Sequence, residues 1–471
     1  MIRFLYEQEL VELENAPADL TVLDWLRLYR HRTGTKEGCG SGDCGACTVT
    51  TVSVLRDSAG KASLHYQSVN SCIAFVGALH GTQLLSVESL ARDGTLHPVQ
   101  QAMVDEHGSQ CGFCTPGFVM SLYTLYQQNE PAETLHEKID QALGGNLCRC
   151  TGYRPIKAAA SAAIEYRTAY GRKAGDENSL IAKLELLSAS SVKTTGFHQP
   201  RSLQELAEIY KSSPTSHLLA GGTDLALQVT QQMKTLADII HVGGVPELQV
   251  VDIQTDHLLL GAAVTLSDCL EVMSDRLPAA RDMLLRFGSD QVRNKATIGG
   301  NIGSASPIGD LPPLLLALDA RLSLQCGDVV RTVALHDYFL GYRQTCLQEG
   351  EFIRQVHIPL PSPDSLFAVH KISKRTEDDI SSVCLAVHLP QQTGVIVNAR
   401  LAFGGMAAIP VRAGATELAL DGKPFNQETV AFAQDQLATE LHPIDDARAS
   451  AAYRLQVARN LLQRVLSEAT V

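Results

Sequence analysis

The chain has 471 residues, more than one hydrophobic core usually serves, so we expect three or four domains. Its 45% hydrophobic and 19% charged residues are typical of a globular protein. The formal net charge of −12 argues against a general nucleic-acid binder and against docking on an anionic membrane.

No segment of the sequence indicates secretion or membrane insertion. Residues 1–20 lack the apolar stretch of a signal peptide, and the longest apolar run, residues 311–318, is too short to cross a bilayer. Twelve cysteines without a secretion signal indicate thiols kept reduced. We therefore expect a cytoplasmic protein.

The first 80 residues predict a small α+β unit. Residues 2–13 read as a β-hairpin, and an amphipathic helix follows that should end near Gly34. A β-rich run covers residues 48–55, after a loop that contains three cysteines. Strand, helix, cysteine loop and strand thus alternate.

The next segment, residues 97–170, predicts helices only. Pro98, Pro116 and Pro155 each stand where a helix begins, and Gly144 with Gly145 ends another helix. Residues 171–199 then read as a linker with one short helix inside it.

Beyond Pro200 the pattern is mixed. Proline-rich residues 359–363 mark a further boundary, because proline is excluded from central strands and helix interiors. The remainder predicts a strand over residues 395–403 and a last helix over about 447–466.

Four cysteines of the first unit have the spacing C-x4-C-x2-C followed by a distant cysteine: Cys39, Cys44, Cys47 and Cys72. This is the plant-type ferredoxin spacing for a [2Fe-2S] cluster. The residues between them are small, and glycine lets the backbone approach the sulfurs of a cluster. Zinc or unliganded thiols are the alternatives, but zinc favours separated C-x2-C pairs.

A second set combines C-x2-C with C-x-C: Cys111, Cys114, Cys148 and Cys150. Both pairs come shortly before predicted helix starts, where the helix dipole stabilises thiolates. Spacing alone leaves zinc open, and the neighbouring ferredoxin set favours a second iron–sulfur cluster. The remaining cysteines, Cys269, Cys326, Cys346 and Cys384, read as small buried hydrophobic residues.

Two glycine loops are candidates for a phosphate site. Residues 218–225 and 297–302 each follow an apolar stretch, and successive backbone amides in such loops can bind an anion. Each loop could also be a plain tight turn. Neither G-x-G-x-x-G nor a P-loop motif occurs in the sequence, so a Rossmann or P-loop nucleotide site is not supported.

Taken in order, the ferredoxin spacing, residues 110–117 (QCGFCTPG), residues 145–152 (GNLCRCTG) and the two glycine loops resemble the molybdenum hydroxylases of the xanthine dehydrogenase type. The resemblance covers essentially the whole chain. It implies a multidomain α+β protein: a β-grasp ferredoxin-like domain (1–82), a helical [2Fe-2S] domain (83–168), a linker (169–195), an FAD domain of the vanillyl-alcohol-oxidase (PCMH) type (196–362) and a C-terminal α+β flavoprotein domain (363–471).

The resemblance also implies the flavin contacts. The FAD pyrophosphate would lie on the first loop, with further contacts from the second loop and from scattered positions: Leu218, Leu219, Ala220, Gly221, Gly222, Thr223, Asp224, Leu225, Phe287, Ala296, Thr297, Gly300, Asn301, Ser304, Asp310, Ile353 and Lys371. Taken alone, Asp310 could be a helix cap and Lys371 a solvated charge. Residues 371–380 resemble a loop that governs whether NAD or oxygen reaches the flavin, and could otherwise be a charged surface loop.

The implied function is electron transfer within a purine-hydroxylating, NAD-dependent enzyme. Electrons from hypoxanthine or xanthine would pass from a molybdenum cofactor through both [2Fe-2S] clusters to FAD and then NAD. Because no molybdopterin domain is recognised, that cofactor and all catalytic residues for the purine step would lie on a separate large subunit, in a heterodimer that pairs into a heterotetramer. No nucleic-acid or membrane partner is implied.

Two alternatives remain open at this point. The chain could serve another molybdenum hydroxylase that acts on aldehydes or N-heteroaromatic compounds, since the substrate would bind elsewhere. It could also be a zinc-stabilised scaffold that carries no electrons.

Overall fold

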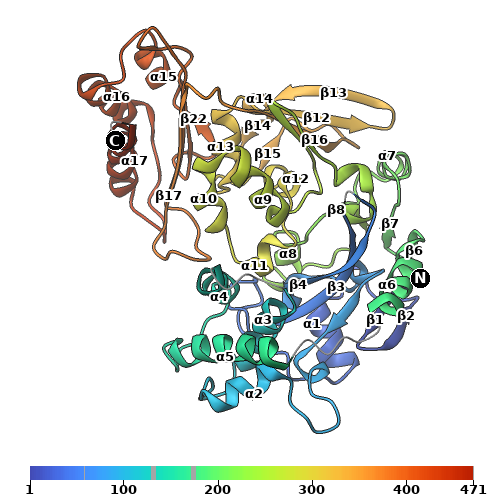
Figure 1. The fold of residues 1–471 in the computed structure, drawn as a ribbon. Coiled ribbons are helices and arrows are strands. Elements are labelled where there is room, and N and C mark those ends of the chain that lie inside the picture. The colour runs from blue at the N-terminus through green and yellow to red at the C-terminus, as the bar shows by residue number, and fades with distance from the viewer. Residues whose placement is uncertain (58, 129–133, 171–176, 470–471) are drawn as a thin grey trace. The chain divides into compact units, whose positions relative to one another are not determined.

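A computed structural model describes residues 1–57, 59–128, 134–170 and 177–469 (Figure 1). The chain divides into two compact units that interleave along the sequence. The first unit comprises residues 1–201, 215–244 and 288–296, and the second comprises residues 202–214, 245–287 and 297–471. The segments 215–244 and 288–296, both expected in the flavin domain, thus belong to the unit that holds the two four-cysteine sets.

The first unit begins with the expected α+β fold. Its mixed five-stranded sheet has the order β2-β1-β5-β3-β4, in which β1 and β5 are parallel. The strands are β1 (Ile2–Tyr6), β2 (Glu9–Leu13), β3 (Thr48–Arg56), β4 (Ala62–Asn70) and β5 (Gln83–Leu85). The hairpin and the strand after the cysteine loop are confirmed.

The predicted helix after the hairpin is shorter than expected. It consists of α1 (Val22–Asp24) and a π-helical turn, Trp25–Tyr29, and ends before Gly34. Trp25 is buried and packs edge-on against Phe4 and Tyr6 of β1. The aromatic contacts fix the helix to the sheet, while Leu28 and Tyr29 are exposed.

Four helices pack beside this sheet, as expected (Figure 1). They are α2 (Pro98–Asp105), α3 (Thr115–Gln127), α4 (Leu135–Leu143) and α5 (Arg154–Tyr170). The central helix, α3, contacts β3 and buries ten residues from Gly117 to Tyr126. Each proline stands in the first turn of its helix, and Gly144 caps α4.

The rest of the first unit contains a second sheet with the order β6-β7-β9-β8. Its elements are α6 (Glu177–Ser188), β6 (Val192–Thr194), β7 (Phe197–Gln199), β8 (His217–Leu219), α8 (Ala226–Thr230), β9 (Ile239–His241) and α11 (Asp290–Arg293). The predicted linker contains α6, which packs on β3 and β4, whereas its residues 171–176 lie outside the described residues.

The second unit begins with the antiparallel sheet β10-β11-β16-β12-β13 and the elements around it. These are α7 (Leu203–Ser212), β10 (Val251–Ile253), β11 (His257–Gly261), α9 (Leu266–Arg276), α10 (Arg281–Leu285), α12 (Ile298–Gly303), α13 (Leu311–Ala317), β12 (Arg321–Cys326), β13 (Val329–Ala334), α14 (Leu335–Tyr338), β14 (Phe339–Gly341), β15 (Gln344–Thr345) and β16 (Phe352–Pro359). The apolar run at 311–318 is thus a buried helix, α13.

The C-terminal part forms a second antiparallel sheet, β17-β18-β21-β22, covered by helices. Its elements are β17 (Leu366–Ile372), β18 (Val383–Leu389), β19 (Gln391–Gln392), β20 (Val395–Ile396), β21 (Arg400–Gly404), β22 (Val411–Arg412), α15 (Gly414–Leu420), α16 (Gln427–Glu440) and α17 (Ala451–Ala469). The predicted strand at 395–403 is split into β20 and β21.

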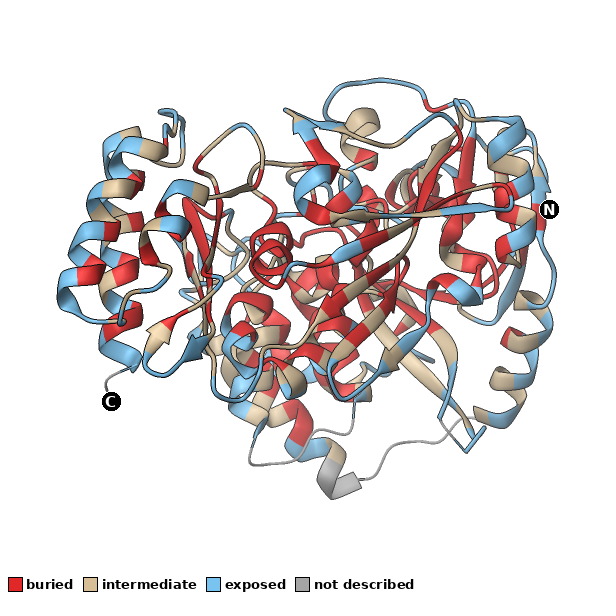
Figure 2. Ribbon diagram, turned by 90° about the horizontal axis from the view of Figure 1, so that it is seen from above, coloured by how far each residue is buried: buried red, intermediate tan, exposed pale blue. Residues whose placement is uncertain are grey.

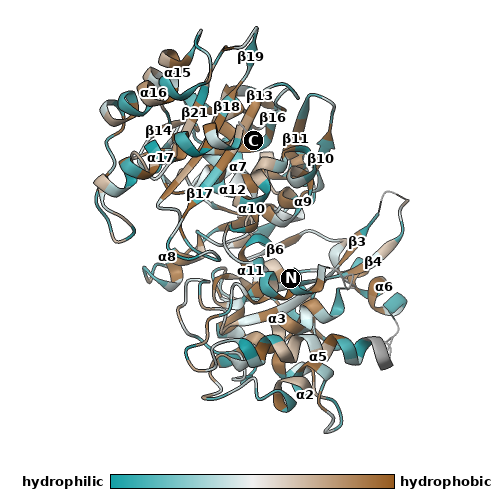
Figure 3. Cartoon of the chain, turned by 60° about the vertical axis from the view of Figure 1, so that its left-hand side comes forward, coloured by the Kyte–Doolittle hydropathy of each residue, from teal (hydrophilic) through white to brown (hydrophobic). Residues whose placement is uncertain are grey.

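Apolar residues of this sheet form one core with α15, α16 and α17, and Figure 3 colours hydrophobic residues brown on the ribbon. Figure 2 shows the outer faces of these C-terminal helices as exposed and their inner faces as buried. Among the described helices, none combines the length and hydrophobicity of a membrane span.

Candidate functional site

The first cysteine set is brought together as the spacing predicts. The sulfurs of Cys47 and Cys72 lie 3.2 Å apart. Thiol hydrogen bonds from Cys44 and then Cys72 hold the pKa of Cys39 well below its usual value. The four sulfurs are therefore neighbours, although Cys72 comes from the far end of the β3–β4 hairpin.

Glycines give the first cysteine loop its tight path. Gly40, Gly42 and Gly45 have positive φ angles, which side chains rarely adopt. A Cβ atom at Gly38 would lie 2.7 Å from the Cys44 sulfur. The amide of Ser41 donates to the Cys39 sulfur at 3.4 Å, as expected for a loop that wraps a cluster. The donor set and the loop fit a [2Fe-2S] group.

The second cysteine set consists of two close pairs. The hydrogen bond that the Cys150 thiol donates to Cys111 is the main reason that the pKa of Cys150 is raised. Burial, followed by the hydrogen bond to Cys148, raises the pKa of Cys114 to about 12. Cys114 stands at the N-cap of α3, so the positive end of a thirteen-residue helix faces the set.

Backbone amides also reach the second set. Thr151 donates its amide to the Cys148 sulfur at 3.4 Å, and the amide of Cys148 donates to the Tyr153 hydroxyl at 3.0 Å. Four thiols with amide donors fit a second cluster. Within the described residues, no group of three or more His, Cys, Asp or Glu side chains is arranged to hold a single metal ion.

The two sets differ in exposure and are joined by one backbone hydrogen bond. Cys47 and Cys72 are 1% and 2% exposed, whereas Cys111 and Cys150 lie at the surface. The amide of Leu147 donates to the carbonyl oxygen of Cys44 at 3.0 Å. Because Leu147 precedes Cys148, this bond directly links the segments that carry cysteines of the two sets.

The first glycine loop packs against the first cysteine set. A Cβ atom at Gly221 would lie 1.7 Å from the Lys295 carbonyl oxygen, so the backbones touch and only glycine fits. Gly222 has a φ of +81°, and its Cβ would lie 3.1 Å from the carbonyl oxygen of Ile73. Ile73 directly follows Cys72 of the first set.

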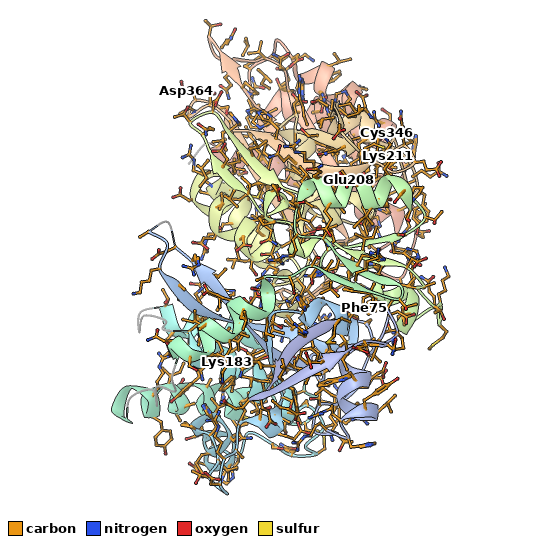
Figure 4. The ribbon with its side chains drawn as sticks, turned by 90° about the vertical axis from the view of Figure 1, so that its right-hand side faces the viewer. Phe75, Lys183, Glu208, Lys211, Cys346 and Asp364 are labelled. Carbon is orange, nitrogen blue, oxygen red and sulfur yellow. The ribbon has the colours of Figure 1, made fainter. Side chains whose placement is uncertain are left out.

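A second contact joins the segment after this loop to the same set. Gln231, after α8, donates its amide to the carbonyl oxygen of Cys39 at 3.0 Å. Phe75, labelled in Figure 4, follows Cys72 closely in the sequence. It is 1% exposed, and its burial anchors the segment that carries Cys72. The candidate flavin loop and the ferredoxin-type set are thus packed together within one unit.

The second glycine loop belongs to the second unit. Thr297 caps α12 and accepts the amide of Gly300 at 3.0 Å. Gly299 approaches Ala262 so closely that its Cβ would lie 2.6 Å from that carbonyl oxygen. Within the described structure, the buried Oδ1 atom of Asn301 has no hydrogen-bond partner, while the hydroxyl of Ser304 donates to the Asn301 carbonyl. An unpaired buried acceptor is costly and fits a ligand that donates to it.

Asp310 and Lys371 form a buried ion pair in the second unit. The Lys371 ammonium donates to the Asp310 carboxylate at 2.8 Å and to the Arg286 carbonyl at 2.9 Å. Ser381 donates to the other carboxylate oxygen at 2.6 Å. Both charged residues are 4% exposed. Asp310 stands at the N-cap position of α13 but makes no side-chain cap hydrogen bond, and the alternative of a solvated lysine is wrong because Lys371 is buried.

Two further predicted positions lie in the same unit. The Lys371 ammonium is 6.0 Å from the centroid of the Phe287 ring, and Ile353, on β16, is 8% exposed. The first glycine loop belongs to the first unit, together with Ala296. The second glycine loop, which begins at Thr297, belongs to the second unit.

Arg286 anchors the loop at residues 371–380 and was not singled out from the sequence. Its guanidinium donates to the carbonyl oxygens of Lys371 and Thr376 and to the hydroxyl of Ser373, at 3.0–3.1 Å. An arginine outside a motif has no recognisable sequence signal. The loop itself is exposed from Lys374 to Thr376.

Four family models match consecutive parts of the chain. They are the 2Fe-2S iron-sulfur cluster binding domain over residues 6–77, the [2Fe-2S] binding domain over 86–161, the FAD binding domain in molybdopterin dehydrogenase over 191–361 and the CO dehydrogenase flavoprotein C-terminal domain over 368–469. The chain belongs to the molybdenum hydroxylase family. It carries the iron–sulfur and FAD portion of that family, with two [2Fe-2S] domains and one FAD-binding domain.

Named relatives of this molybdenum hydroxylase chain include xanthine dehydrogenase 2 of Arabidopsis thaliana, which is 33% identical over 88% of the chain. The match spans only 36% of the relative's length. A solved carbon monoxide dehydrogenase of Hydrogenophaga pseudoflava is 29% identical, with a TM-score of 0.54, over 57% of this chain and 95% of the other. Quinoline 2-oxidoreductase of Pseudomonas putida 86 is 26% identical, also with a TM-score of 0.54, over 59% and 96%.

Proposed function

We propose that this chain is the electron-transfer subunit of a xanthine dehydrogenase. A separate molybdopterin subunit would oxidise hypoxanthine or xanthine, and this chain would carry the electrons to NAD. The observation that carries the proposal is a continuous series of contacts in the first unit, from the exposed second cysteine set to the first glycine loop.

The series begins at the surface with Cys111 and Cys150. It continues inward through Cys148 and the hydrogen bond from Leu147 to Cys44, and reaches the buried pair Cys47 and Cys72. It ends where Ile73 touches Gly222 of the candidate flavin loop. This order supports transfer from the second set to the first and then to the flavin, so that the two cysteine sets act in the reverse of their order in sequence.

The chain's own residues would hold the cofactors as follows. All eight cysteines are proposed as cluster ligands, and the two glycine loops with Phe287, Ala296, Asp310, Ile353 and Lys371 as the FAD contacts. When bound, the clusters carry single electrons, and the flavin combines them into the two-electron reduction of an acceptor. The protein positions these groups, and no general acid or base on this chain is required for the purine step.

The separate subunit is supported by the carbon monoxide dehydrogenase relative. The match takes up 95% of that solved chain, so in that protein the matched region forms a chain of its own. The substrate and NAD rest on sequence similarity to the xanthine dehydrogenases, one of which is 33% identical. A heterotetramer and a cytoplasmic location are the expectations that accompany this assignment.

The test is to purify the native complex through a tag on this chain and record its visible spectrum under nitrogen. We expect iron–sulfur and flavin bands that are bleached by xanthine or hypoxanthine and restored by NAD, with NADH formed. A protein without these bands would contradict the electron-transfer role.

The same titration separates the related substrates. Bleaching by an aldehyde, quinoline or carbon monoxide, without a response to purines, would show another molybdenum hydroxylase. Restoration by oxygen but not by NAD would overturn the proposed acceptor and leave the electron route intact.

A further inference from the structure

A buried network of polar side chains surrounds the hydrogen bond between the two cysteine sets. The side-chain amide of Asn146 donates to the Gly45 carbonyl at 3.1 Å. Ser121 donates to the Asn146 Oδ1 atom at 2.7 Å, and Gln291 donates to the same atom at 3.0 Å and to Ser121 at 3.1 Å. Thr48 donates to Gly45 at 2.7 Å. No residue of this network is a proposed ligand of a cofactor.

Two hydrogen bonds join consecutive residues of one loop to consecutive residues of the other. Asn146 binds the carbonyl oxygen of Gly45, and the next residue, Leu147, binds the carbonyl oxygen of the preceding residue, Cys44. The two hydrogen bonds therefore clamp the loop of the second set to the loop of the first. Asn146 fixes the position from which Leu147 donates.

The network is almost fully removed from water. Asn146 is 2% exposed, Gln291 1%, Ser121 1% and Thr48 1%. Burying four polar side chains is unfavourable unless their hydrogen bonds are made, and the bonds made here hold the side chains in one arrangement. Within the described residues, the Oε1 atom of Gln291 is the member of the network that is buried without a hydrogen-bond partner. Gly145 leaves room for the Gln291 side chain, because a Cβ atom at Gly145 would lie 2.3 Å from the Gln291 Oε1 atom.

Gln291 ties a third segment to the clamp. It lies on α11, and four residues later the Lys295 carbonyl touches Gly221 of the first glycine loop. The segment 288–296 thus contacts the junction of the cysteine sets at one end and the candidate flavin loop at the other.

We propose that Asn146 is a positioning residue for electron transfer between the two cysteine sets, and that Gln291 reinforces it. This inference rests on the proposed electron-transfer function. Asn146 holds the Leu147 amide against the Cys44 carbonyl and so sets the separation and orientation of the two ligand loops. Gln291 keeps the Asn146 side chain oriented with its amide toward Gly45.

The first variant is Asn146→Asp in the complete complex. The carboxylate preserves the shape and the acceptor for Ser121 and Gln291, but it replaces the donor to Gly45 with an acceptor. We expect hydrogen exchange of the Leu147 amide to become about tenfold faster, the effect of losing one hydrogen bond. The magnetic interaction between the two reduced clusters in low-temperature EPR should weaken, and transfer between them should slow.

The second variant, Gln291→Met, keeps Asn146 and removes the hydrogen bonds that Gln291 donates to Asn146 and Ser121. It should produce a smaller change of the same kind, and it provides the test if Asn146→Asp does not fold. The matched control is Thr50→Val. Thr50 and Thr124 form another buried contact between β3 and α3, with their hydroxyls 2.9 Å apart, and Thr124 retains Met120 as a partner.

The control should leave Leu147 exchange and the magnetic interaction unchanged. Unchanged values in both test variants, or an equal change in Thr50→Val, would overturn the proposal. Iron content and the separate cluster signals distinguish this failure from failure of the proposed function. A positioning role leaves both intact, whereas the absence of cluster signals in the unmutated protein contradicts the function itself.

Discussion

The two cysteine sets each bring four thiols together, but they do so on different kinds of local structure. Three cysteines of the first set lie on a glycine-rich loop before β3 and the fourth, Cys72, follows β4, and two of the four sulfurs are buried. The second set lies where helices begin, and two of its sulfurs reach the surface. Phe113 and Leu147, beside the second set, are 48% and 41% exposed.

This difference is what we expect if the second set receives electrons from a partner protein and the first set passes them on within the chain. A redox group must come close to its partner protein, and exposed thiols with apolar neighbours allow that approach for the second set. Cys47 and Cys72 of the first set are buried, and Cys39 and Cys44 are partly exposed, so under the proposed function we expect this set to exchange electrons mainly within the chain. Three experiments can break or sharpen the contrast.

The largest effect is expected from replacing one ligand in each set. Cys47→Ser and Cys111→Ser should each lose one cluster and therefore about half of the iron. Cys47→Ser should in addition lower the free energy of unfolding by at least about 5 kcal/mol, because a structural metal site is lost from within a core. Cys111→Ser should cost clearly less. Iron analysis, EPR and thermal unfolding measure these differences.

Equal destabilisation of the two cysteine variants would contradict the contrast between a buried and a surface site. Retention of two unaltered EPR signals and full iron content in either variant would contradict its assignment as a ligand.

An intermediate effect is expected from the glycines. Gly45 and Gly112 both have positive φ angles, +66° and +84°. A Cβ atom at Gly45 would lie 2.2 Å from the Gly145 carbonyl oxygen, whereas one at Gly112 meets no described atom within 4 Å. Gly112→Ala should cost about 1 kcal/mol for the backbone alone, and Gly45→Ala at least about 3 kcal/mol. Similar unfolding temperatures for the two variants would show that the loops do not pack as described.

The smallest effect is expected in how stability depends on pH, through His97 in the helical part of the first unit. His97 caps α2, accepting the Val99 amide at 3.3 Å, and its ring packs edge-on against Tyr123 and Tyr126 of α3. Burial, and then the charge of Arg92, lowers the pKa of His97 to about 4 from 6.5. The folded state resists protonation, so the contribution of His97 to stability is complete above pH 6.5 and is lost as the pH falls towards 4.

His97→Asn keeps a capping side chain but cannot titrate in this range. Compared with the unmutated protein, it should retain about 1 kcal/mol more of its neutral-pH stability at pH 4.5, allowing for partial exposure of the histidine. Unfolding temperatures between pH 7 and 4.5 measure this. Parallel pH curves would assign the acid sensitivity to other groups.

Local features were predictable from the sequence. The cysteine spacings, the hairpin and the prolines at helix starts depend on neighbouring residues, and the structure has each of them. The helix after the hairpin was predicted too long, because its apolar pattern does not show that it ends in a π-helical turn at Tyr29. Cys326 and Cys346, the latter labelled in Figure 4, are partly exposed and not buried as expected.

Features that depend on distant residues were not predictable. Asn146 and Gly45 are 101 residues apart in sequence, and Gln291 reaches Asn146 across 145 residues. The Asp310–Lys371 pair spans 61 residues, so each residue in isolation suggested a more ordinary role. A single sequence does not reveal which polar side chains meet in the interior. The predicted domain bounds and flavin contacts remain predictions.

The bond between Leu147 and Cys44 also constrains how the protein matures. Once residues 145–147 lie against residues 44–45, and Gln231 holds the Cys39 carbonyl, the sulfurs of Cys47 and Cys72 are closed off from solvent. We therefore expect iron and sulfide to reach Cys47 and Cys72 while that cover is open. Cys111 and Cys150 stay exposed, so we expect the second centre to be able to accept its metal after the first, an order opposite to the electron flow proposed above.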